Sequence, residues 1–127
     1  MKVLIVDDDE ALTDLIKEMI DRMGIFRVKT AANGEEGYEV FFHFKPDIIL
    51  TDIQMPVKNG LEMVRDIRNH DPGIKTIYMT GNMRLFRTRL EEEKTKYKAS
   101  LIEKPFSYSS LTGLFYKYRE EKGGDTR

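Results

Sequence analysis

The chain has 127 residues, of which 34% are charged, and its 21 basic and 22 acidic residues leave a formal net charge of -1. This length and a hydrophobic content of 40% are typical of a single folded domain and argue against disorder. The balanced charge argues against direct nucleic-acid binding and the absence of cysteine excludes thiolate chemistry. The apolar runs are too short for a signal peptide or a membrane span, so we expect a cytoplasmic protein.

The N-terminal half alternates short apolar runs with amphipathic stretches. Residues 3–6 predict a strand buried on both faces, and apolar residues at helical spacing over residues 12–23 predict a helix with Gly24 as its C-cap. Residues 25–31 predict an edge strand. The next predicted elements are a turn at residues 33–34, a helix over residues 37–44 and a strand over residues 47–51.

The C-terminal half continues this alternation. The apolar positions of a third helix run from Leu61 to Ile67, and residues 76–79 predict a fourth strand. The charge-rich residues 85–98 predict a fourth helix that is mostly solvated, with Glu91, Glu92 and Glu93 on an exposed face. The remaining predicted elements are a fifth strand at residues 100–102, a fifth helix capped by Ser107 with an apolar stripe from Leu111 to Tyr118, and a flexible tail.

The order of these elements predicts an α/β fold. Each strand is joined to the next by a helical crossover, which implies a parallel sheet covered on both faces. We therefore expect a doubly wound domain over residues 1–121 and a flexible tail over residues 122–127.

Polar residues occupy the predicted carboxyl ends of the strands, where open parallel sheets bind their ligands. The residues at these ends are Asp7, Asp8 and Asp9 after the first strand, Asp52 after the third, Thr80 after the fourth and Lys104 after the fifth. Converging carboxylates repel one another unless a cation neutralises them, and oxygen ligands without histidine or cysteine favour Mg²⁺. Asp52 is the candidate nucleophile for phosphate chemistry, with Thr80 as a hydrogen-bond donor and Lys104 as a positive charge for the phosphoryl group.

Each of these residues also has an ordinary structural explanation. Acidic residues before a helix are favoured as caps, and we expect Asp9 to be one. Thr80 suits a strand, and a lysine such as Lys104 is commonly solvated. The complementary groups on four strand ends favour a site. We expect His43 and His70 to be surface residues without a role in it.

Four segments resemble one known family. They are residues 3–9 (VLIVDDD), residues 46–56 (PDIILTDIQMP) with Asn59 and Gly60, residues 79–81 (MTG) and residues 103–106 (EKPF). In this order and spacing the chain resembles the response-regulator receiver domain of two-component signalling over nearly its whole length. The resemblance implies a flavodoxin-like sheet with strand order 2-1-3-4-5 and five helices.

The resemblance also implies a function. Asp52 would accept a phosphoryl group from a phosphohistidine of a sensor histidine kinase or a phosphotransfer protein, with Thr80 and Lys104 assisting. Asp7, Asp8, Asp52 and the backbone carbonyl of Gln54 would hold Mg²⁺. Such a domain is a switch that promotes its own phosphorylation and dephosphorylation, rather than an enzyme. Its fourth helix, fifth strand and fifth helix would contact a downstream target protein or an effector domain.

Three positions qualify the resemblance. Leu101 stands where the family usually has an aromatic residue that moves together with the threonine, and the sequence leaves open whether Tyr97 or Tyr108 replaces it. Gln54 and Asn82 occupy variable positions that would tune the lifetime of the acyl phosphate. The peptide bond between Lys104 and Pro105 is expected to be cis by the same resemblance.

Two rival functions have different sequence requirements. A phosphohydrolase of the haloacid-dehalogenase type would need a second aspartate two residues after Asp52, where this chain has Gln54. A receiver-like binding module that is never phosphorylated would not need the strand-end residues to be intact. The sequence also leaves open whether the domain acts alone or belongs to a longer regulator.

Overall fold

The computed structural model describes the backbone of residues 1–125 and the side chains of residues 1–120. Five parallel strands form one sheet in the order β2-β1-β3-β4-β5, which confirms the predicted topology. The strands are β1 (Lys2–Val6), β2 (Arg27–Ala31), β3 (Ile48–Asp52), β4 (Lys75–Thr80) and β5 (Ala99–Glu103). The helices are α1 (Glu10–Asp21), α2 (Gly34–Phe44), α3 (Gly60–Arg68), α4 (Arg87–Lys96) and α5 (Tyr108–Asp125).

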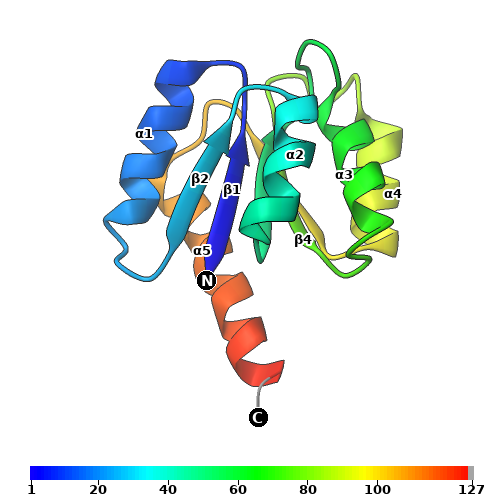
Figure 1. Cartoon of the computed structure of the whole chain (residues 1–127). Helices are drawn as coiled ribbons and strands as arrows, with labels where there is room; N and C mark the ends of the chain where they lie inside the picture. The colour runs from blue at the N-terminus through cyan, green and yellow to red at the C-terminus, as the bar shows by residue number, and fades with distance from the viewer. Residues whose placement is uncertain (126–127) are drawn as a thin grey trace.

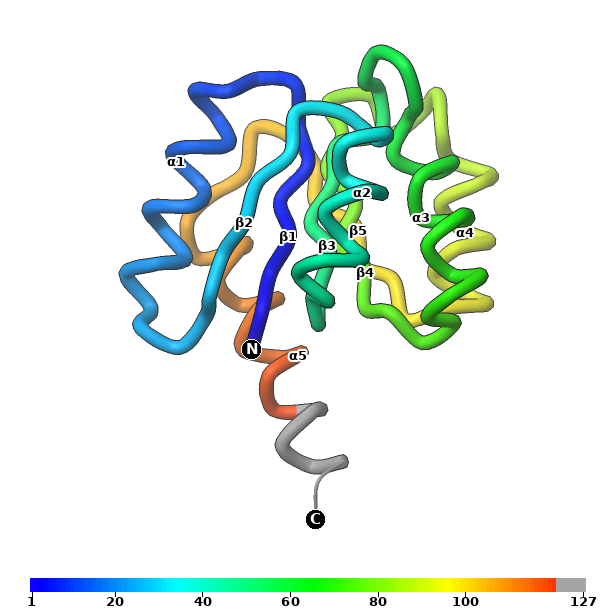
Figure 2. Tube along the Cα trace, in the orientation of Figure 1, coloured from blue at the N-terminus to red at the C-terminus, as the bar shows by residue number. Residues whose placement is uncertain are grey.

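Helices cover both faces of the sheet. Helices α1 and α5 lie on one face, and α2, α3 and α4 lie on the other (Figures 1 and 2). Strand residues alternate between the two cores, since Ile77 and Met79 pack with α1 and α5 whereas Tyr78 packs with α3 and α4. Val3, Leu4, Ile5 and Val6 are fully buried, as expected of a central parallel strand.

The strand register aligns the carboxyl ends of the strands that carry the predicted site residues. Val6 of β1 pairs with Thr51 of β3, so the residues that follow them, Asp7 and Asp52, leave the sheet side by side. Thr80 of β4 pairs with Glu103 of β5, which places Lys104 at the same edge.

The ends of the helices confirm some predicted caps and correct others. The side chain of Asp9 accepts the Leu12 amide at 3.1 Å and caps α1, and Ser107 accepts the Ser110 amide at 3.1 Å at the start of α5. The C-cap assigned to Gly24 is wrong, because α1 ends at Asp21 and its C-cap is Arg22. Gly24 lies beyond the helix with a φ of +72°, in the connection to β2.

One predicted surface feature is wrong because a contact between distant segments changes it, and the two predicted surface histidines are confirmed. Glu93 is not on a solvated face of α4, since both of its carboxylate oxygens bind the Arg68 guanidinium. His70 is exposed as predicted, but its Nε2 lies 3.0 Å from the Tyr38 hydroxyl. His43 is exposed.

The end of the chain extends the predicted domain. Helix α5 is described to Asp125, four residues past the predicted boundary at residue 121. Side chains beyond residue 120 and the backbone of residues 126–127 lie outside the described part, so the flexible tail at 122–127 stays a prediction. Among the described helices, none combines the length and apolar character needed to span a bilayer.

Val57 lies in a strained turn between β3 and α3. Its φ is +71°, its side chain is 75% exposed, and the Lys58 amide donates to the Pro56 carbonyl at 2.8 Å across it, which is the hydrogen bond of a γ-turn. A β-branched residue is disfavoured at positive φ, whereas glycine is not. We expect Val57→Gly to raise the free energy of unfolding by about 1 kcal/mol, measured by urea titration.

Val57→Ala separates the backbone effect from the loss of an exposed apolar group. Alanine keeps the Cβ that disfavours positive φ, so this variant is expected to be close to wild type. Equal stabilisation by both variants would contradict the strain.

Candidate functional site

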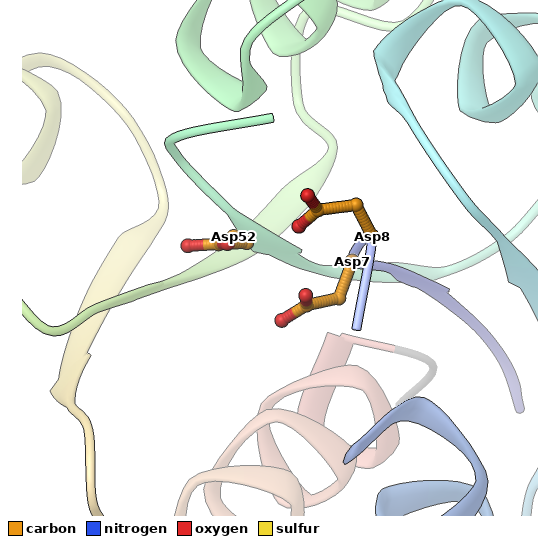
Figure 3. Close-up of side chains that lie close together, drawn as sticks. All are labelled: Asp7, Asp8 and Asp52. Carbon is orange, nitrogen blue, oxygen red and sulfur yellow. The ribbon is translucent and has the colours of Figure 1, made fainter. Parts of the chain in front are cut away.

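Three aspartates gather at the carboxyl edge of the sheet. Asp7 and Asp8 follow β1, and Asp52 ends β3. Each offers a carboxylate oxygen, and these three oxygens lie within 4.8 Å of one another. Asp7 is 2% exposed, whereas Asp8 is open to solvent. Figure 3 shows the carboxylates of Asp7 and Asp8 turned toward the side of Asp52.

Backbone groups fix the direction of the Asp52 carboxylate. The Ile53 amide donates to its Oδ1 at 2.8 Å, and the Gly60 amide in turn donates to the Ile53 carbonyl at 2.9 Å. Thr51 donates its hydroxyl to the Asp52 carbonyl at 2.8 Å. The start of α3 is therefore tied to the end of β3, which leaves the second oxygen, Oδ2, facing Lys104.

Asp7 is held in the same way. Its backbone amide donates to the Ala31 carbonyl of β2 at 3.1 Å. Its Oδ1 accepts the Asp9 amide at 2.9 Å, which leaves Oδ2 for the lysine. Asp9 therefore supports the site through its backbone while its side chain caps α1.

Lys104 connects two of the carboxylates. Its Nζ lies 2.8 Å from Asp7 Oδ2 and 3.5 Å from Asp52 Oδ2. Its backbone amide donates to the Thr80 carbonyl at 2.9 Å, and the Lys104–Pro105 bond is cis as predicted. The lysine is therefore part of the acidic cluster and is not an ordinary solvated side chain.

Burial and neighbouring charges make this a costly place for negative charge. Burial, with the Asp7 carboxylate next in importance, raises the pKa of Asp52 above its usual range, although Lys104 opposes the shift. Burial alone would lower the pKa of Lys104, but the hydrogen bond to Asp7 and the charge of Asp52 outweigh it and raise that pKa. Lys104 is thus fixed in its charged form and the carboxylates still carry excess negative charge.

This excess suits a hard divalent cation. The donors are all carboxylate oxygens, two of them on partly or fully accessible residues, and their mutual repulsion would fall on binding a cation. Gln54 lies two residues beyond Asp52 in the exposed loop after β3, where its backbone was predicted to supply another oxygen. The donor set fits Mg²⁺.

Thr80 faces the loop that leads to α4. It is 1% exposed, and its Oγ1 accepts the Asn82 amide at 3.0 Å. The Asn82 side chain in turn accepts the Leu85 amide at 3.3 Å. The predicted hydrogen-bond donor is therefore at the correct edge of the sheet, and its hydroxyl orders the approach to α4.

Neither Tyr97 nor Tyr108, the two tyrosines close to Leu101 in the sequence, is a buried side chain. Leu101 is partly buried and packs against the core beneath α4. The Tyr97 ring stacks on the Arg68 guanidinium at 3.5 Å, and Tyr108 is 48% exposed at the start of α5.

Sequence reasoning missed the groups that orient Asp52. Gly60 was named only within a segment that resembles the family, with no role assigned to it, yet a Cβ built on it would lie 2.1 Å from the Asp52 carbonyl oxygen. The Ile53 amide is likewise a backbone group, and backbone groups leave no pattern of residue types. The one sequence signal was Gly60 itself, because glycine is a less favourable residue than most at the start of a helix and so indicates that another backbone segment lies close to it.

The comparisons with known proteins agree with this geometry. Residues 3–115 match the family model of the response regulator receiver domain. The chain belongs to this family. The receiver domain is 36% identical to Protein CcdB of Bacillus subtilis, over 87% of this chain and 90% of that protein. It is 38% identical to the chemotaxis protein CheY of Thermotoga maritima over 60% of this chain, and spans 63% of the length of that protein.

A solved structure extends the likeness to three dimensions. The response regulator protein TrrA of Thermotoga maritima, in complex with Mg(2+)-BeF, is 30% identical to the receiver domain, with a TM-score of 0.79. The match covers 92% of this chain and 97% of that one. Response regulators work with kinases and effector domains, so the receiver domain is a component of two-component signalling.

Proposed function

We propose that the receiver domain accepts a phosphoryl group on Asp52 in an Mg²⁺-dependent reaction. The proposal rests on one observation: Asp52 Oδ2 lies 3.5 Å from the Lys104 ammonium, within a cluster of three converging carboxylates. A carboxylate needs no base to attack phosphorus, so positioning and charge neutralisation are the main tasks of the protein.

The residues divide these tasks. Asp7, Asp8, Asp52 and the Gln54 carbonyl would hold Mg²⁺, which would neutralise charge on the transferring phosphoryl group. The Ile53 amide holds one oxygen of Asp52, so the other oxygen attacks phosphorus. The bond from phosphorus to the donor nitrogen breaks, and its electron pair stays on the imidazole. Lys104 then pairs with the new phosphoryl oxygens, and Thr80 can turn its hydroxyl toward them.

The donor is proposed to be a sensor histidine kinase or a phosphotransfer protein. An apolar groove beside Lys104 is formed by α1 and the loop after β5, and Leu15 on its rim is 51% exposed. A protein that presents a phosphohistidine to Asp52 can bury this apolar surface as it docks. A cytoplasmic location, expected from the sequence, belongs to the same proposal.

The output surface is proposed to comprise α4, β5 and α5. Large side chains are exposed along it, at Tyr97, Tyr108 and Tyr116. A downstream target protein or effector domain would bind this surface.

The proposal is tested by incubating the domain with a small acyl phosphate. In Mg²⁺ the intact mass should increase by one phosphoryl group, and with EDTA in place of Mg²⁺ it should not. An unchanged mass in Mg²⁺ would contradict the proposal. Continued release of phosphate from simple monoesters over many turnovers would favour the haloacid-dehalogenase alternative.

Removing the lysine charge tests its role in transfer. Lys104→Met keeps a long apolar stem, and we expect the initial rate of phosphorylation to fall by about 10²- to 10³-fold, measured by intact mass. Mg²⁺ should bind more tightly, because Asp7 and Asp52 lose their internal cation. Lys98→Met, an exposed lysine before the opposite end of β5, is the control and should behave as wild type. An unchanged rate for Lys104→Met would show that the lysine only stabilises the fold.

A further inference from the structure

Helix α4 is attached to the domain by three polar side chains, Arg68, Tyr78 and Glu93, which we call the α4 clasp. Glu93 lies on α4, Arg68 ends α3 and Tyr78 lies in β4. The Arg68 guanidinium donates to Glu93 Oε2 at 3.1 Å and to Oε1 at 2.7 Å. The Tyr78 hydroxyl donates to Oε1 at 2.5 Å. One carboxylate therefore joins three elements.

The clasp is largely removed from water. Tyr78 is fully buried, and the side chains of Arg68 and Glu93 are 10% and 15% exposed. Burial, with Glu93 beside it, raises the pKa of Tyr78 well above its usual range, so the hydroxyl keeps its proton and donates. Within the described part of the chain, Arg68 Nε has no hydrogen-bond partner.

Such a cluster adds little net stability to the fold, but it requires one specific arrangement of its side chains. Desolvation of the two charges offsets much of their attraction, whereas the paired hydrogen bonds are satisfied in only one arrangement. The clasp therefore specifies where α4 sits.

Other attachments of α4 are few. All ten residues of this helix are described, and Leu90 alone is buried. The described contacts include no side-chain cap at its start, whereas Asp9 caps α1 and Asn59 forms a capping box with Glu62 on α3. With so little apolar anchoring, the position of α4 depends on the clasp.

The clasp is also close to the proposed switch. Tyr78 and Thr80 are two residues apart in β4 and so point to the same face of the sheet. Thr80 holds the approach to α4 through the Asn82 amide. If the Thr80 hydroxyl turns toward a phosphoryl group on Asp52, the Asn82 amide loses its partner, and the clasp and Leu90 remain to hold the helix.

We propose that the α4 clasp is a positioning device that holds α4 in its resting place and opposes its displacement when the domain is phosphorylated. The second part rests on the proposed phosphorylation of Asp52. The first part concerns the unphosphorylated domain and can be tested separately.

Tyr78→Phe removes one hydroxyl from the clasp and leaves the ion pair. We expect hydrogen exchange of the α4 amides, residues 90–96, to become about tenfold faster while α2 stays unchanged. Tyr118→Phe is the matched control. Tyr118 is also buried, and its hydroxyl lies 2.6 Å from Ser100 Oγ, but it packs with the α1 and α5 core. This control should leave α4 exchange at the wild-type rate.

Phosphorylation provides the second readout. With Mg²⁺ and a small acyl phosphate, Tyr78→Phe should be phosphorylated about threefold faster than wild type, because α4 resists displacement less. Tyr118→Phe should match wild type. If no variant is phosphorylated, the proposed function fails, while the exchange result still decides whether the clasp positions α4.

A second substitution keeps the test decisive if Tyr78→Phe does not fold. Glu93→Gln keeps the side-chain size and should accelerate α4 exchange in the same way, because it removes the charge that pairs with Arg68. The clasp is overturned if α4 exchange is unchanged in both clasp variants, or if Tyr118→Phe accelerates it equally. An unchanged phosphorylation rate beside faster exchange would overturn its role in switching.

Discussion

Asp52→Asn is expected to abolish phosphorylation by a small acyl phosphate in Mg²⁺ and to make the domain more stable. An amide oxygen is a poor nucleophile toward phosphorus, so no phosphoryl group should be added to the intact mass. Because burial and Asp7 raise the pKa of Asp52, the folded state disfavours its charge. Removing that charge should therefore raise the unfolding temperature at pH 7.

The higher unfolding temperature expected of Asp52→Asn would show that this variant is folded, so that its lack of phosphorylation reflects the missing nucleophile. Asp9→Asn provides the control within the same acidic run, since its side chain caps α1 and asparagine caps equally well. It should be phosphorylated like wild type. Equal labelling of Asp52→Asn and wild type would remove Asp52 from the role of acceptor.

Gly60→Ala is expected to lower the free energy of unfolding by about 3 kcal/mol, measured by urea titration. A Cβ on Gly60 would lie 2.1 Å from the Asp52 carbonyl oxygen and 3.1 Å from Thr51 Oγ1. Both neighbours are held in the sheet, so the start of α3 must move away. This movement also disturbs the Ile53 amide that orients Asp52, and phosphorylation should slow in the fraction that remains folded.

Gly113→Ala controls for the general preference of helices for alanine. Gly113 lies within α5, and a Cβ there would have nothing within 4 Å. This variant should be as stable as wild type or up to about 1 kcal/mol more stable. A small loss for Gly60→Ala, comparable with an ordinary surface substitution, would mean that α3 can shift without cost.

The sequence predicted the arrangement of the strands because burial leaves a strong pattern in residue type. Parallel strands buried on both faces appear as apolar runs, and the rule that ligands bind at their carboxyl ends was enough to place Lys104 near Asp7, 97 residues away. The predicted order of the strands was therefore sufficient to bring together residues from opposite ends of the chain. The proposed roles of these residues remain predictions.

Side-chain contacts between helices were beyond that reasoning. Glu93 resembles its neighbours Glu91 and Glu92 in sequence, and only the packing of α3 against α4 sets it apart by bringing Arg68 to it. The partner of His70, which follows α3, is likewise distant in sequence, since Tyr38 lies on α2, 32 residues away. A charged residue on a helix can be solvated or can pair with a residue of another element, and the sequence pattern of the helix is the same in both cases.

The side chains of β4 alternate between the two cores of the domain, with odd-numbered residues in one core and even-numbered residues in the other. Ile77 and Met79 contact the core beneath α1 and α5, the side proposed to meet the phosphoryl donor, whereas Tyr78 contacts the core beneath α3 and α4. The two cores can therefore change independently in evolution, as long as the backbone of β4 is kept. A receiver domain built in this way can alter the packing of α4, one part of the proposed target surface, while the core that supports α5 and the proposed donor groove stays the same.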